Sequence, residues 1–517
     1  MSMKRSQLVS QGTIQRMRHE AEHAWNERNL DLCLELLERA SRLDPANIQI
    51  LLQLGRMYGM RYDYAAAERV FDKAIRITPK KVEILAAAAQ QAKDFYSTHL
   101  AEGYLRSAIQ QEHEITAEVL VKLADIYERI RRTNDAEHLI ARALQKNPGY
   151  APALLSSARL AARSKQFETA ERLLRLAIPK ADSDTKIKGW YELGAVLDRQ
   201  ERYDEAMEAF LQAKVILRRT ASPYIEHLKR VRKHLAQLRE SLSDDLFQRW
   251  FEFQNELQPL HRLALLGGHP RSGTTLLEQL LDSHPGIVSA EETTHFTDYA
   301  YTPLQRMHPM GTPMLRVLES ASKDAIVKAR SDYYHASELC IGKSLSEKLL
   351  VDKNPSLTLT LPSLARIFPE IKILLVLRDP RDVCLSCFMQ PFVPIQQVNS
   401  SYLSLDTTVE EYGELMKMWL MVKPYLKSPF LEIRYEAMID DLELVARNVL
   451  NFLQVPWHAG VLNYDQHATQ KVVRSPTYVD VTQKLFTRAK GRWQNYEKFM
   501  APHLEKLDPF LKAFGYD

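Results

Sequence analysis

The chain has 517 residues, of which 45% are apolar and 26% charged. This length exceeds what one hydrophobic core usually serves, so we expect at least two domains, and the composition excludes a disordered or fibrous chain. The 69 basic and 65 acidic residues leave a formal charge of +4, which is too even a balance for a nucleic-acid-binding protein. Any anion site must therefore be local.

The first residues and the cysteines bear on the compartment. Residues 1–10 include basic side chains without an apolar run after them, and no later segment is long and apolar enough to cross a bilayer. Four cysteines are too few for a disulfide scaffold in a chain of this length. We therefore expect a cytoplasmic protein with reduced thiols and no membrane span.

A pattern of small, aromatic and proline residues repeats between residues 14 and 214. In its clearest copy Gly55, Phe71 and Pro79 hold the key positions, and Pro45 lies 34 residues before Pro79. Small residues recur in register in later copies, at Ala101, Ala108, Ala136, Ala143, Ala170, Ala177, Ala206 and Ala213. A period of this length predicts one pair of antiparallel helices in each copy.

Small residues let paired helices approach, aromatic rings fill the space between them, and proline ends the second helix. The pattern resembles the tetratricopeptide repeat, with six copies and His113 in place of the proline of the third. The resemblance implies an all-α superhelix with a concave groove that binds a peptide or partner protein. A structural arm or a dimerisation surface is the alternative. Residues 215–250 are helical and charged, and we expect a capping helix or linker whose charges, such as Arg218 and Arg232, are solvated.

The spacing of apolar residues changes near residue 260. A short apolar run at 263–266 precedes a glycine-rich loop and a helical stretch at 276–281. Such a loop directs backbone N–H groups toward an anion, and the helix adds the positive end of its dipole. Gly268 and Gly273 have the spacing of a nucleotide P-loop, but Thr274 replaces the usual lysine. The loss of this lysine disfavours an ATP-dependent kinase, which stays the alternative enzyme.

A second apolar strand is predicted at 371–377, and it ends in Arg378 just before a helix that carries Ser386. Ligands of open parallel sheets bind at the carboxyl ends of strands. This segment therefore predicts a second site for a phosphate group.

Both motifs together, at 270–276 and 377–386, resemble those of sulfotransferases that use 3′-phosphoadenosine 5′-phosphosulfate (PAPS), and the resemblance covers residues 260–500. Residues 290–293, Ala-Glu-Glu-Thr, are most similar to the tyrosylprotein branch. The resemblance implies an α/β P-loop-like sulfotransferase domain at 251–517 with a mostly parallel central sheet, behind the all-α array at 14–214.

The family resemblance also assigns roles to individual residues, with PAPS as co-substrate and no metal. The residues implied to hold PAPS are Arg271, Ser272, Gly273, Thr274, Thr275, Arg378, Ser386, Tyr435, Lys490 and Arg492. Those implied to act in catalysis are Arg271, Lys353, Thr477 and Glu292, the last as general base. Transfer would be in line, with positioning and fixed charges dominating.

Several alternatives stay open in the sequence. His295 is a second candidate for the base, and His269 a third. Cys384 and Cys387 have the spacing of a metal pair, but the chain offers no second pair, so we expect them to pack.

The acceptor hydroxyl is also undecided. Thr294 and Asp298 stand where the tyrosylprotein branch has arginines for acidic peptides, so it could belong to a protein tyrosine, a carbohydrate, a lipid or a small molecule. The non-enzymatic alternative is a repeat-based adaptor whose second domain binds a nucleotide without turnover.

Overall fold

The computed structural model describes residues 2–111, 115–257, 261–392, 397–469 and 489–516. Its internal contacts divide the chain into two compact units, Met1–Thr185 and Lys186–Asp517. No helix in the described ranges combines the length and the apolar character that a membrane span requires.

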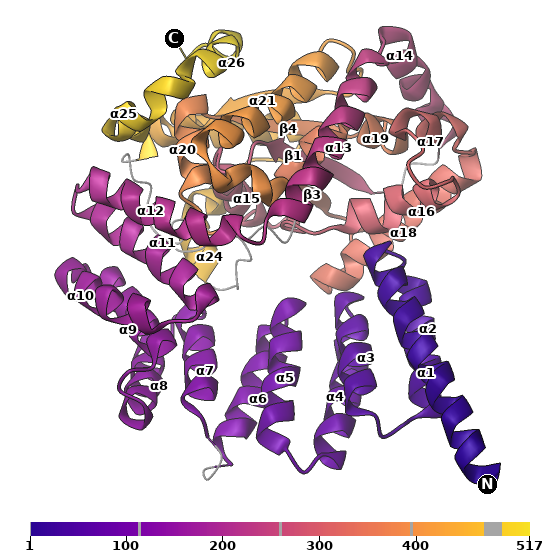
Figure 1. Ribbon diagram of the computed structural model, residues 1–517. Coiled ribbons are helices and arrows are strands. Elements are labelled where there is room, and N and C mark those ends of the chain that lie inside the picture. Colours follow the sequence, from indigo (N-terminus) through magenta and orange to yellow (C-terminus); the bar gives the residue numbers. More distant parts are fainter. Residues whose placement is uncertain (1, 112–114, 258–260, 393–396, 470–488, 517) are drawn as a thin grey trace. The chain divides into compact units, whose positions relative to one another are not determined.

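The repeats form antiparallel helix pairs (Figure 1). Between the helices of each pair lies one residue with a φ of 58° to 65°, and these residues are Arg28, Tyr62, Tyr96, Arg131, Lys165 and Glu201. Their numbers differ by 34, 34, 35, 34 and 36, which confirms the six predicted copies. The pairs are α1 (Ser2–Asn26) with α2 (Leu30–Leu43), α3 (Ile48–Met60) with α4 (Tyr64–Ile77), α5 (Lys81–Asp94) with α6 (Thr98–Ile109), α7 (Ala117–Arg129) with α8 (Thr133–Lys146), α9 (Ala151–Arg163) with α10 (Phe167–Ala177), and α11 (Ser183–Arg199) with α12 (Tyr203–Arg218).

Glycine and phenylalanine set the distance between paired helices. A Cβ at Gly55 of α3 would lie 2.4 Å from the ring of Phe71 on α4. Gly194 and Phe210 repeat this contact in the last pair, where the distance would be 2.6 Å. The close approach that the sequence pattern predicts is therefore present, and only glycine allows it at these positions.

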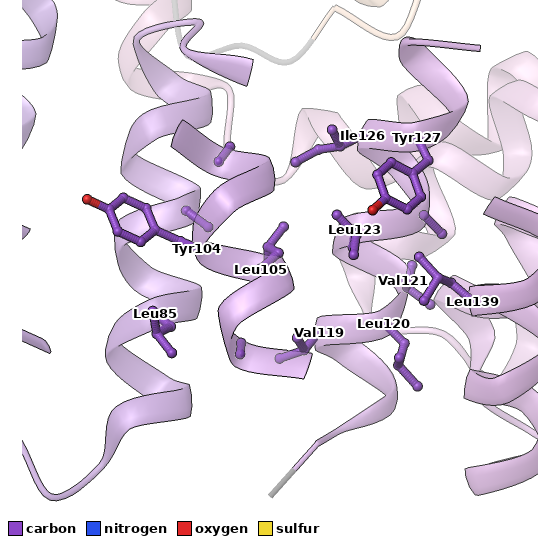
Figure 2. Close-up of a cluster of buried hydrophobic side chains, with 14 of the residues drawn as sticks. Leu85, Tyr104, Leu105, Val119, Leu120, Val121, Leu123, Ile126, Tyr127 and Leu139 are labelled. Carbon is purple, nitrogen blue, oxygen red and sulfur yellow. The ribbon is translucent and has the colours of Figure 1, made fainter. Parts of the chain in front are cut away.

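One hydrophobic core runs through successive pairs of the first unit. Figure 2 shows a part of it, to which Leu85, Leu105, Val119 and Leu139 contribute from four successive helices. Each pair thus buries its apolar face against its neighbours, as solenoid repeats do.

The second unit contains a sheet of five parallel strands in the order β2-β3-β1-β4-β5. The strands are β1 (Arg262–Gly268), β2 (Ile287–Ser289), β3 (Leu349–Lys353), β4 (Lys372–Leu377) and β5 (Phe430–Arg434). Residues 263–268 of β1 are all buried, so both faces of the sheet are covered, as parallel sheets require. The predicted α/β domain with a mostly parallel sheet is confirmed.

Helices α15 and α23 share a core with the strands, in which Leu266 of β1 lies with Leu277 and Val449. The α-helices of this unit beyond the repeats are α13 (Ser222–Glu240), α14 (Asp244–Glu252), α15 (Thr274–Asp282), α16 (Thr302–Arg306), α17 (Met314–Ser320), α18 (Lys323–Ile341), α19 (Leu361–Ile367), α20 (Pro380–Phe388), α21 (Leu405–Val422), α22 (Tyr435–Asp440), α23 (Leu442–Leu453), α24 (Tyr464–Thr469), α25 (Glu497–Met500) and α26 (Asp508–Phe514).

Nearly all of the sixth helix pair lies in the second unit, because the division falls at Thr185 and not at the predicted end of the array. The fully buried Lys214 of α12 donates from Nζ to the carbonyl oxygen of Tyr402 at 2.5 Å. Burial lowers the pKa of this lysine to about 7. The bounds at 214 and 250 stay predictions, but the last repeat is built into the unit that carries the sheet.

The charges of residues 215–250 are not all solvated, and this expectation was wrong. Arg218 donates to the carbonyl oxygen of Leu403 at 2.9 Å. Arg232 of α13 pairs with Glu411 of α21 at 2.9 Å, and the carboxylate of Glu411 is buried. These long cations join the segment to the sheet domain, and sequence spacing cannot show partners so far along the chain.

Candidate active site

The glycine-rich loop connects β1 to α15 and is held by unusual backbone conformations. Arg271 has a φ of 73°, and Gly273, the N-cap of α15, has a φ of 101°. A Cβ at Gly273 would lie 2.4 Å from the ring of Tyr435, and one at Gly268 would lie 2.5 Å from the carbonyl oxygen of Val376. The loop therefore needs glycine both for its conformation and for close approach of its backbone.

The two predicted phosphate motifs meet in one place. Nε of Arg271 donates to Oγ of Ser386 on α20 at 3.0 Å. Nη1 of Arg378, which directly follows β4, donates to the backbone carbonyl of Arg271 at 3.1 Å. Loop, strand end and helix thus form the wall of a single site at the carboxyl edge of the sheet.

Arg378 is 8% exposed and is held from several sides. Its guanidinium lies 4.9 Å from the centre of the Tyr435 ring and 3.7 Å from the carboxylate of Asp382, and it donates to the carbonyl oxygen of Ala489. Among the described residues, its Nε is buried without a hydrogen-bond partner. A buried donor of this kind suits an anion that is bound from outside the chain.

A second charged group lies at the end of β3, where Lys353 is fully buried. Its Nζ lies 2.6 Å from Oε1 of Glu292 and 3.3 Å from Oε2 of Glu278. Burial alone lowers the pKa of Lys353, but the two carboxylates outweigh it, and the pKa is raised above its ordinary value. Lys353 therefore stays charged.

Glu292 is the accessible member of this group, because 44% of its side chain is exposed. Its neighbours fix the backbone that carries it. Nδ2 of Asn354 donates to the carbonyl oxygen of Thr293 at 2.9 Å, and the N–H of Glu291 donates to Oγ of Ser289 at 3.0 Å. The structure thus brings Glu292 and Lys353 into direct contact, while their predicted roles stay predictions.

Two cations of the predicted PAPS-binding set, Lys490 and Arg492, have acidic partners. Nζ of Lys490 lies 3.0 Å from Asp440 at the surface, and Nη2 of Arg492 lies 2.8 Å from Asp198. The remaining PAPS-binding predictions lie in the loop or beside it: Ser272, Thr274 and Thr275 are buried there, and Tyr435 packs against Gly273. Thr477 lies outside the described residues.

The two alternative bases are enclosed. His269 is fully buried, with Nδ1 2.8 Å from the carbonyl oxygen of Pro270, and burial lowers its pKa to about 4. His295 is 1% exposed, and its Nδ1 lies 3.2 Å from Oγ of Ser337. Both geometries are those of structural histidines.

Cys384 and Cys387 are fully buried, and burial raises the pKa of Cys387 to about 12. Over the described ranges, no group of three or more His, Cys, Asp and Glu side chains is arranged to hold a metal ion. The expectation that these cysteines pack thus agrees with their surroundings.

Three supporting residues were missed in the sequence. Glu278 is a buried carboxylate inside an apolar helical stretch, which is a signal that could have been used. Asp382 lies within the Arg378 motif and received no role. Thr358 gave no signal, yet its Oγ1 bonds both the N–H and the carbonyl of Gly268 at 3.0 Å.

Comparison with known families agrees with this geometry. Residues 264–459 match the model described as "Sulfotransferase family". These residues are therefore similar to the sulfotransferase family. Three tetratricopeptide repeat models match residues 48–78, 131–191 and 187–214.

Relatives of two kinds resemble the chain. An uncharacterised protein of Aquifex aeolicus is 23% identical over 76% of this chain and 50% of its own, so the chain spans about half the length of that relative. Protein-tyrosine sulfotransferase 1 of Danio rerio is 28% identical over 49% of this chain and 72% of its own. Among solved structures, the sulfotransferase domain of the Synechococcus PCC 7002 olefin synthase is 19% identical, covers 46% of this chain and 88% of its own, and has a TM-score of 0.31.

Proposed function

We propose that this protein transfers a sulfuryl group from PAPS to an acceptor hydroxyl. The observation that carries the proposal is the convergence of Arg271, Arg378 and Ser386 on one site, joined by contacts of 3.0 and 3.1 Å. PAPS bears a 5′-phosphosulfate and a 3′-phosphate, and two arginines at one site suit a ligand with two anionic ends.

The hydrogen-bond donors of the site and the close packing of its loop support this choice of co-substrate. The loop backbone approaches Tyr435 too closely for any residue but glycine at position 273, and α15 directs its N-terminus toward the loop. Arg271 and the loop would hold the 5′ end, while Arg378 and Ser386 would hold the 3′-phosphate. The buried Nε of Arg378 offers one further donor.

PAPS, when bound, supplies the sulfuryl group and a phosphate leaving group. The chain supplies position and charge, because transfer of this kind needs stabilisation of negative charge on the leaving side. Arg271 is the cation within the loop. Fixed donors of this kind are typically worth about 3 kcal/mol each.

Glu292 is the general base in this proposal. Its carboxylate is reachable from solvent, and the buried ammonium of Lys353 holds it at 2.6 Å. Lys353 would thereby orient the carboxylate that removes the proton from the acceptor hydroxyl. General base catalysis typically contributes a factor of about 10² to 10⁴.

The first test is ligand-induced thermal stability of the full chain. We expect PAPS to raise the melting temperature more than ATP does, and Arg271→Ala to abolish the rise, because binding to the folded state stabilises it by mass action. The matched control is Arg447→Ala, which removes an arginine whose side chain is 49% exposed. Equal stabilisation of the wild type and Arg271→Ala by PAPS would reject the assigned site.

The second test separates binding from chemistry. Glu292→Gln keeps the shape of the side chain but removes the base, so PAPS should still stabilise the variant while sulfation falls by about 10² to 10⁴. Sulfation at the wild-type rate would remove Glu292 from the mechanism. Magnesium-dependent ATP turnover would favour a kinase, and PAPS binding by a chain that sulfates no acceptor would favour an adaptor.

The repeat models suggest a role for the array as well. We propose that its groove binds a protein or peptide, since tetratricopeptide arrays are protein-binding modules. The acceptor of the sulfuryl group, whether protein tyrosine, carbohydrate, lipid or small molecule, could be delivered in this way.

A further inference from the structure

The last helix pair of the array contacts the segment beside Arg378. Asp198 lies near the end of α11, and its Oδ1 accepts a hydrogen bond from the hydroxyl of Tyr496 at 2.7 Å. Nη2 of Arg492 lies 2.8 Å from the same oxygen. Arg492 and Tyr496 bound one short helix, η10 (Arg492–Tyr496), so a single carboxylate holds both of its ends.

The start of the same helix is also held by Asp382 of α20. The N–H groups of Gly491 and Trp493 both donate to the carboxylate of Asp382, at 2.8 Å each. That carboxylate lies 3.7 Å from the guanidinium of Arg378. A continuous chain of polar contacts thus runs from Asp198 through η10 and Asp382 to Arg378.

The contacts at Asp198 are shielded from water. The side chain of Asp198 is 13% exposed and that of Arg492 is 29% exposed, while Tyr496 is fully buried. The Tyr496 ring also packs against Tyr203, with ring centres 5.3 Å apart. Loss of the Asp198 carboxylate would leave a buried hydroxyl and a largely covered guanidinium without this acceptor, which η10 can relieve only by moving.

We propose that Asp198 is a positioning residue for the 3′-phosphate pocket: it fixes η10, whose amides hold Asp382 and thereby orient Arg378. This inference rests on the proposed function. It gives the sixth repeat a role in recognition of the co-substrate that is separate from any protein bound by the array.

The test compares two nucleotides on the full chain by isothermal titration calorimetry. One is 3′-phosphoadenosine 5′-phosphate, and the other is adenosine 5′-monophosphate, which differs from the first only in lacking the 3′-phosphate. Asp198→Ala should raise the Kd of the first by about tenfold or more and that of the second by less than about twofold, since a charge-assisted contact is typically worth a factor of that size. A general loss of structure would weaken both nucleotides alike.

Matched variants distinguish an effect of Asp198 on the position of η10 from a general loss of protein stability. Asp204→Ala removes an exposed carboxylate that also pairs with the C-terminal segment, 2.5 Å from Lys498, which lies outside η10. It should leave both affinities unchanged, and Asp198→Glu should restore part of the loss. If Asp198→Ala does not fold, Tyr496→Phe removes one of the two contacts and should lower the preference for the 3′-phosphate in the same direction.

The outcomes distinguish the two proposals. A wild-type protein with no preference for the 3′-phosphorylated nucleotide would overturn the proposed function and this inference with it. A wild-type preference that survives unchanged in both Asp198→Ala and Tyr496→Phe would overturn the role of Asp198 alone.

Discussion

At the scale of single residues, the site depends on buried charges that each contact a group of opposite charge. Lys353 is fully buried between Glu278, which is also fully buried, and the half-exposed Glu292. Removal of one partner from a buried ion pair leaves an uncompensated charge in a medium that solvates it poorly. The stability of this group is therefore strongly non-additive.

Lys353→Met should lower the free energy of unfolding by about 3–5 kcal/mol, because Glu278 then stays buried without its cation. The double variant Lys353→Met/Glu278→Gln should recover part of this loss, since no fully buried charge remains. Urea denaturation of the two variants checks this. Additive losses in the double variant would show that the pair is not coupled.

Asp352, the neighbour of Lys353, makes stability depend on pH. Burial raises its pKa from 3.8 to about 7, an effect that a hydrogen bond from Tyr333 and the charge of Lys353 only partly offset. The folded state thus retains a proton that the unfolded state loses above about pH 4. The stabilisation is complete below pH 4 and is lost as pH rises to about 7.

Asp352→Asn provides the reference, because asparagine does not titrate. The melting temperature of the wild type relative to this variant should fall between about pH 4 and pH 7 and stay level above pH 7. The corresponding loss in free energy of unfolding is about 1.4 kcal/mol for each unit of the pKa difference. If the difference in melting temperature between the wild type and Asp352→Asn is constant over this pH range, Asp352 is charged in the folded state.

At the residue scale, the sequence could place the two motifs at one edge of the sheet, because neighbours in the chain form each of them. The loop around Arg271 and the segment from Arg378 to Ser386 each sit on one strand-to-helix turn, and parallel strands bring such turns to the same edge. Arg492 shows the limit, because its partner Asp198 lies 294 residues away, in the sixth repeat. No spacing rule relates the two.

At the scale of helices, close approach within a pair explains why glycine occupies Gly55. Gly55→Ala should destabilise the protein by about 1–3 kcal/mol, because its Cβ would lie 2.4 Å from a fully buried Phe71 ring. Gly103→Ala is the matched control, since that glycine is also within a helix but has no atom within 4 Å of a built Cβ.

The control should stabilise the protein by about 1 kcal/mol through helix propensity alone. Thermal unfolding of both variants measures the contrast. Equal and small effects of the two substitutions would contradict the packing role of Gly55.

Sequence patterns predict the helices and the longer strands more directly than the short strands. The runs at 263–266 and 371–377 correspond to β1 and β4, which lie in the sheet interior and are apolar after their first, charged residues Arg262 and Lys372. β2, with residues 287–289, is an edge strand too short to leave a period. β5 has only one buried residue, Ile433, so its pattern resembles that of a loop.

At the scale of the whole molecule, the last repeat is part of the domain that follows it. Lys214, Arg232 and Asp198 each bond residues of the sheet domain. A chain of residues 183–517 should therefore fold and respond to PAPS as the full protein does. A chain of residues 251–517 should lose the response, because it lacks the partners of Glu411 and Tyr496.

Thermal shift with PAPS on both truncated chains checks this boundary. A PAPS response in residues 251–517 equal to that of the full chain would contradict a structural role for the sixth repeat. The sequence could not reveal this role, since a repeat pattern looks the same whether its last copy faces solvent or another domain.

The central claim is that the converging site around Arg271 and Arg378 delivers a sulfuryl group to an acceptor. Incubation of the full chain with ³⁵S-labelled PAPS and a fractionated extract measures this directly. We predict that the wild type labels an acceptor, while Arg271→Ala and Glu292→Gln do not. Equal labelling by all three proteins, or no labelling by a wild type that binds PAPS, would contradict the claim.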